Sequence, residues 1–108
     1  MAPWLDRMDR HFDEKLVRGI VPLSEKVAPP KRPSEYFERQ CWISFEPVET
    51  CLPILADKLG AHKILWATDY PHRDGFFPGA PKMIADALPE GARQKVLGQS
   101  AREFYKLS

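Results

Sequence analysis

Apolar positions along the chain recur with two different periods, and these periods predict the order of the elements. Near the start, large apolar residues recur at every fourth position, which is the spacing of one helix face. Pro3 suits the first turn of such a helix and Gly19 suits its end. The pattern predicts an amphipathic helix over residues 1–20. Its apolar stripe consists of Trp4, Met8, Phe12, Leu16 and Ile20.

Two short apolar runs in the second half predict β-strands. Residues 40–45 and 63–68 are mostly apolar on both faces, as buried parallel strands are. Between them, residues 48–59 show helical spacing, with Thr50 as the predicted N-cap and Gly60 as the predicted end. This order of strand, helix and strand predicts a right-handed βαβ unit with two parallel strands.

The remaining segments complete a three-part organisation. Residues 21–34 are rich in proline and predict an extended connector. Beyond the second strand, we expect a helix over residues 81–88 and two short helices, the last opened by Ser100 as a capping box. The chain is therefore predicted to be α/β, with a helix (1–20), a connector (21–34) and a βαβ unit with C-terminal helices (35–108).

Composition excludes several classes of function. The chain has 108 residues with 16 basic and 15 acidic side chains, and the basic ones are scattered, so nucleic-acid binding is unsupported. No apolar run approaches the roughly 20 residues that span a bilayer, and the first residues lack a signal peptide's apolar core. We expect a soluble cytoplasmic protein. The spacing of Cys41 and Cys51 fits no redox or zinc motif and predicts reduced, buried packing residues.

Polar side chains gather where the second predicted strand ends. Ligands in α/β folds bind outside the carboxyl ends of the strands, so Asp69 lies where a metal ligand or a general base is expected. Because the predicted strands are parallel, Glu46 should emerge at the same edge, although a carboxylate there could also serve the dipole of the following helix. The sequence therefore predicts a site around Asp69 with Glu46 nearby.

The loop after Asp69 offers further candidates. His72 could be a metal ligand, a substrate contact or a proton donor, or it could be a structural residue of the loop. Asp74 could order the loop or contact substrate, and Phe76 could line a substrate pocket or pack beneath the loop. We take Asp69 and His72 as candidate catalytic residues, and Asp74, Phe76 and Glu46 as candidate substrate contacts.

Residues 64–75, ILWATDYPHRDG, resemble the last barrel strand of the amidohydrolase-related family that includes aminocarboxymuconate-semialdehyde decarboxylase-like enzymes. Residues 39–47 resemble the preceding strand of that family, and residues 96–105 its closing helix. The resemblance implies a (β/α)₈ barrel with a catalytic divalent metal, zinc or manganese. It also implies that Asp69 is a metal ligand or a proton-transfer group.

The family's other metal ligands have no counterpart in this sequence. A His-X-His pair is absent, since the only histidines are His11, His62 and His72. A whole barrel needs about 250 residues. We therefore expect the C-terminal part of a metal-dependent hydrolase or non-oxidative decarboxylase for small carboxylated or amide substrates, inactive alone and without bound metal.

A non-catalytic function is the alternative. Two strands taken from a barrel would leave unpaired edges, which favour association. We expect a homo-oligomer, and a small oligomeric binding or interaction module remains the second hypothesis.

Overall fold

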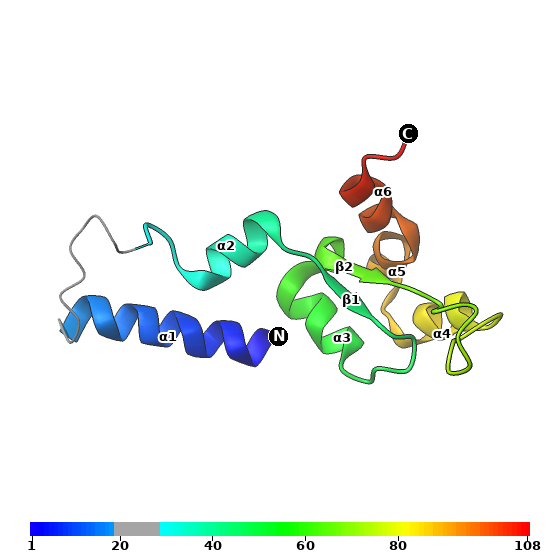
Figure 1. The fold of residues 1–108 in the computed structure, drawn as a ribbon, viewed down its shortest axis with the longest axis horizontal. Coiled ribbons are helices and arrows are strands. Elements are labelled where there is room, and N and C mark those ends of the chain that lie inside the picture. Colours follow the sequence, from blue (N-terminus) through cyan, green and yellow to red (C-terminus); the bar gives the residue numbers. More distant parts are fainter. Residues whose placement is uncertain (19–28) are drawn as a thin grey trace. The chain divides into compact units, whose positions relative to one another are not determined.

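The chain divides into two compact units, Met1–Cys41 and Trp42–Ser108 (Figure 1). The structure, a computed structural model, describes residues 1–18 and 29–108, and of residues 15–18 it describes the backbone alone. No helix in these ranges has both the length and the apolar character needed to cross a membrane.

The first unit consists of two helices, α1 (Ala2–Arg18) and α2 (Pro33–Gln40). Pro33 occupies the first turn of α2, where a backbone N–H would have no helical partner. The Glu35 carboxylate accepts a hydrogen bond from the Arg32 N–H at 2.8 Å and so caps this end of the helix. The sequence pattern did not reveal this helix. Most of the predicted connector, residues 21–28, lies outside the described residues.

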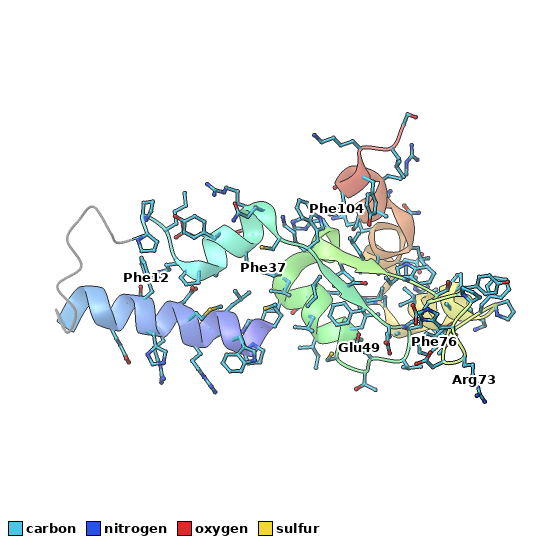
Figure 2. All side chains as sticks on the ribbon, in the orientation of Figure 1. Phe12, Phe37, Glu49, Arg73, Phe76 and Phe104 are labelled. Atoms are coloured by element: carbon cyan, nitrogen blue, oxygen red, sulfur yellow. The ribbon has the colours of Figure 1, made fainter. Side chains whose placement is uncertain are left out.

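Both apolar and polar contacts join α1 to α2. Leu5 of α1 and Phe37 of α2 are buried, and Phe12 and Phe37, labelled in Figure 2, line one apolar groove between the two helices. Asp9 Oδ1 accepts a hydrogen bond from the Ser34 N–H at 2.9 Å. These contacts hold the start of α2 against the middle of α1.

The buried face of α1 differs from the predicted stripe. Ala2 and Leu5 are buried, whereas Trp4 is 61% exposed and stacks beneath the Arg7 guanidinium. Trp4 belongs to the predicted apolar stripe but does not line the groove between α1 and α2. Met8 and Phe12 do line the groove, and the side chains of Leu16 and Ile20 lie outside the described part.

The second unit is built on a two-stranded parallel sheet, β1 (Ile43–Phe45) and β2 (Ile64–Trp66), which confirms the predicted βαβ topology. Ile43 pairs with Ile64, and Phe45 pairs with Trp66. The crossover runs through α3 (Leu52–Leu55), the π-helical segment η1 (Ala56–Gly60) and the 3₁₀ turn η2 (Ala61–Lys63). The carboxyl ends of the two strands therefore meet at one edge.

The crossover begins later than the sequence predicted. Thr50 does not cap it, because Cys51 is the N-cap of α3 and no side chain caps that end. Cys51 is therefore exposed outside the helix, not buried on its apolar side. Gly60 ends η1 at φ +86°, in the region that favours glycine, as predicted.

The C-terminal helices contact the sheet at β2. They are α4 (Ala80–Ala87), α5 (Glu90–Gln94), the π-helical segment η3 (Lys95–Gln99) and α6 (Ser100–Tyr105), and η3 contacts both β2 and α4. Ser100 does not open a capping box, because its neighbour Gln99 is already helical and its hydroxyl donates to the Ala61 carbonyl oxygen at 3.0 Å. The apolar core of this unit contains Phe45, Leu52, Leu55, Ala56, Ile64, Ala80, Ile84, Leu88 and Val96.

Candidate active site at the carboxyl ends of the strands

A cleft of about 480 Å³ opens at the carboxyl ends of β1 and β2. We call it the strand-end cleft. Its lining residues are Ser44, Phe45, Glu46, Glu49, Ala67 and Asp69. Three of these six residues carry carboxylates and none is basic, so the cleft favours a cation over an anion. The parallel strands thus bring Glu46 and Asp69, which are far apart in the sequence, to one cavity.

A tight turn after β1 fixes the first wall of the cleft. The Glu49 side chain returns to the start of this turn, where Oε2 accepts a hydrogen bond from the Glu46 N–H at 2.8 Å. The Glu49 N–H donates in turn to the Glu46 carbonyl oxygen at 3.1 Å. Glu49 lies beside the end of β1 in Figure 2. Glu49 was not among the predicted site residues, although a carboxylate three residues after Glu46 has the spacing of a self-capped turn.

The second wall begins at Asp69, which has a left-handed backbone with φ 55°. Aspartate tolerates this region better than most residues. The left-handed turn brings His72 back toward Asp69, and His72 Nδ1 lies 2.9 Å from Asp69 Oδ2. The two side chains are 69% and 52% exposed, so solvent screens their attraction.

Backbone hydrogen bonds hold this loop in place. The His72 N–H donates to the Asp69 carbonyl oxygen at 2.9 Å, and the Phe76 N–H donates to the Thr68 carbonyl oxygen at 2.7 Å. Gly75 lies inside the loop, where an added Cβ would stand 2.9 to 3.0 Å from three carbonyl oxygens. Any larger residue at this position would clash with these oxygens, so the loop requires glycine here.

The loop gathers three side chains that could hold a metal ion. One ligand atom each from Asp69, His72 and Asp74 lies within 4.8 Å of the others, and all three residues are exposed. Carboxylate oxygen and imidazole nitrogen suit both zinc and manganese, so these residues fit a divalent ion. A single ligand position, Asp69, is all that the sequence predicts with certainty of place, because spacing alone does not reveal how the loop folds back.

The remaining candidates lie on the same loop with different surroundings. Phe76 is half-buried, and its N–H donates a hydrogen bond to the Thr68 carbonyl oxygen. Phe77 is 66% exposed, and its ring centroid lies 5.0 Å from that of Tyr70. Arg73 extends away from the loop in Figure 2. The lining of the strand-end cleft includes Asp69 but not His72, Asp74 or Phe76.

Comparison with known proteins adds two matches. Residues 25–107 match the family model described as amidohydrolase. Among solved structures, 5-carboxyvanillate decarboxylase LigW from Sphingomonas paucimobilis matches with a TM-score of 0.71 and 29% identity, over 97% of this chain and 30% of that one. No curated protein matches the chain. The structural match, together with the parallel strand pair, confirms the predicted partial barrel.

Proposed function

The chain belongs to the amidohydrolase family, and from this premise we propose that it forms the C-terminal part of a metal-dependent decarboxylase or hydrolase site. The observation that carries the proposal is the strand-end cleft, where Glu46 and Asp69 meet at the carboxyl ends of two parallel strands. The matched decarboxylase favours non-oxidative decarboxylation of a small carboxylated substrate over amide hydrolysis. The chain spans 30% of that enzyme's length, so the remaining parts of the site lie outside the matched region.

Asp69 is the residue that we assign to the metal, with His72 and Asp74 as neighbouring donors. Zinc or manganese bound there would supply a positive charge that polarises a substrate carboxyl or carbonyl group. The charge of the cleft supports this assignment, because three carboxylates among its lining residues would repel a carboxylated substrate unless a cation intervenes.

Other residues of the chain transfer protons, contact substrate and hold the turn after β1. His72 moves protons, since imidazole is the side chain suited to exchange near neutral pH. Glu46, Asp74 and Phe76 contact substrate, with Glu46 on the β1 side and the other two on the β2 loop. Glu49 keeps the Glu46 turn closed.

We propose that the 108-residue chain is inactive by itself. A catalytic zinc generally keeps three protein ligands and an open position, and the sequence contains no His-X-His pair. The gathered donors of this chain are exposed, so water competes for any ion held there. We expect less than one metal ion per chain after purification without chelators.

A non-catalytic oligomeric module is the second candidate. Each of the two strands has an edge without a partner strand among the described residues, and unpaired edges promote association. A homo-oligomer would cover these edges. Light scattering would show an oligomer if this candidate is correct and a monomer if it is wrong.

A chimera tests the catalytic proposal. Residues 25–107 would replace the matching segment of 5-carboxyvanillate decarboxylase, and decarboxylation would be measured with added manganese or zinc. We expect metal-dependent turnover that Asp69→Asn abolishes. The matched control is Asp57→Asn, which removes an exposed carboxylate outside the cleft and should leave turnover unchanged.

Two results would contradict the proposal. A folded chimera that works equally well with Asp69→Asn would remove Asp69 from the site. Metal-dependent turnover by the unmodified 108-residue chain would show that the chain needs no further ligands.

A further inference from the structure

We propose that the apolar groove between α1 and α2 is a docking surface for a second copy of this chain, whose own α1 packs there. We call it the α1–α2 groove. It measures about 440 Å³ and shares no lining residue with the strand-end cleft, so the inference goes beyond the proposed function. Its walls are formed by Met1, Leu5, Met8 and Phe12 on the α1 side and by Tyr36 and Phe37 on the α2 side.

The side chains of the groove are unsuited to contact with water. Of the ten described residues that line it, only Lys31 is charged. Leu5 and Phe37 are buried within the groove, whereas Met8 is 41% exposed. Apolar side chains gathered along one open groove are typical of a surface that another chain covers.

The spacing of the lining residues favours a helix as the occupant. Met1, Leu5, Met8 and Phe12 follow one another at intervals of four, three and four residues. This alternation keeps an apolar seam in line along a helix that packs lengthwise against another helix. The 8 residues of α2 span about 12 Å and the seam spans about 17 Å, so α2 is too short to cover it.

The charges around the groove favour a second copy as the source of that helix. Residues 2–18 carry four acidic and four basic side chains, so two α1 helices do not repel each other through net charge. Asp13 and Arg32, each next in sequence to a lining residue, pair with each other at 2.9 Å. A strongly acidic or basic partner would therefore find no complementary charge in this pair. An antiparallel pair of α1 helices would also place opposite ends of the two helix dipoles together.

The size of the first unit gives an independent reason for such a pairing. Met1–Cys41 is a pair of helices with 41 residues, and units of about 40 residues usually need a disulfide, a metal or oligomerisation for stability. Cys41 is a free thiol. Ala2, Leu5 and Phe37 are the apolar residues that are buried in the described part of this unit. Two copies related by a two-fold axis would build a larger core from four helices.

The area of the contact determines how tightly two copies should bind. The helices α1 and α2 together offer a face about 37 Å long and about 10 Å wide on each copy. This face is smaller than the interfaces of obligate dimers, which bury about 2,000 Å² or more in total. We therefore expect a reversible dimer with a dissociation constant of roughly 1 to 100 μM.

Sedimentation equilibrium of the 108-residue chain would measure this constant, and methyl NMR would locate the contact. The chain has three methionines. Met8 lies in the groove, whereas Met83 belongs to α4 in the second unit and is similarly exposed at 37%. We expect the Met8 methyl signal to shift on dilution across the dissociation constant while the Met83 signal stays unchanged.

Two matched variants test whether the groove itself holds the dimer. Met8→Glu places a carboxylate in the contact and should raise the dissociation constant at least about tenfold, because a carboxylate buried without a partner is unfavourable. Trp4→Glu makes the same kind of change on α1 at a residue that is 61% exposed and does not line the groove. It should leave the dissociation constant unchanged.

Three results would overturn the proposal. The first is a monomer at about 1 mM, far above the expected dissociation constant. The second is a dimer in which the Met8 methyl signal does not shift on dilution, a result that needs no variant to fold. The third is a dimer that Met8→Glu leaves intact, which would instead favour association through the strand edges.

Discussion

Gly75 offers the sharpest test of how the loop after β2 is built. A Cβ at this position would meet the carbonyl oxygens of Asp69, His72 and Thr68 at 2.9 to 3.0 Å. Ordinary contact begins near 3.4 Å, so the loop would have to open by about 0.5 Å. The three oxygens cannot simply rotate away, because each accepts a backbone hydrogen bond within the same loop.

The Gly75→Ala substitution should therefore lower the free energy of unfolding by about 1 to 3 kcal/mol, the usual cost of overpacking a site that cannot relax. Gly79→Ala is the matched control. Its added Cβ meets nothing within 4 Å and its backbone is ordinary at φ −83°. The entropic gain from alanine is offset by the loss of glycine at the N-cap of α4, so the free energy of unfolding should change by less than about 0.5 kcal/mol.

Urea denaturation followed by circular dichroism would measure both free energies. Amide hydrogen exchange at Phe76, whose N–H bonds to the Thr68 carbonyl oxygen, would report on the loop itself. A Gly75→Ala variant that unfolds at the wild-type urea concentration and keeps the protection of the Phe76 amide would show that the loop accommodates a Cβ at this position.

Three further substitutions test packing elsewhere in the second unit, each by urea denaturation. Lys63→Met keeps a buried aliphatic side chain but removes an ammonium that lies 4.2 Å from the Trp42 ring centroid, and it should lower the free energy of unfolding by about 0.5 to 2 kcal/mol. A higher free energy of unfolding would mean that desolvation of the ammonium outweighs its attraction to the ring. Lys106 has a left-handed backbone at φ 54° directly after α6, where glycine is favoured, so Lys106→Gly should raise the free energy of unfolding by about 1 kcal/mol. A lower free energy of unfolding would contradict this prediction. Ser100→Ala leaves the Ala61 carbonyl oxygen without its hydroxyl donor and should cost about 1 to 2 kcal/mol, whereas an unchanged midpoint would show that this bond adds nothing.

The strand pair and its polar edge could be predicted because they follow from local pattern and one topological rule. The apolar run that contains β2 is short and ends in a polar cluster, and strands linked by one helix are parallel. From these two facts, Glu46 and Asp69 were expected at one edge, and they line one cleft. Gly60 was also recognisable, since a glycine after an apolar helical pattern marks a helix end.

The features that escaped prediction depend on contacts between distant residues or on an ambiguous local signal. Pro33 was taken for part of a connector, although proline also suits a first helical turn, and α2 starts there. Ser100 has the spacing of a capping box, but its hydroxyl bonds to Ala61, 39 residues away. Asp74 joins the donors only because the loop folds back through Thr68 and Phe76.

The exposure of the candidate site limits how strongly its side chains can interact with one another. Two unit charges at about 4 Å interact by about 1 kcal/mol in water and by about 4 kcal/mol at an effective dielectric constant of 20. The Asp69 and His72 side chains are 52% and 69% exposed, so water weakens any attraction between them. Their geometry is set by the loop, whereas the strength of their interaction depends on what excludes water. Excluding water from the loop after β2 should therefore strengthen the contact between His72 Nδ1 and Asp69 Oδ2 without moving either residue.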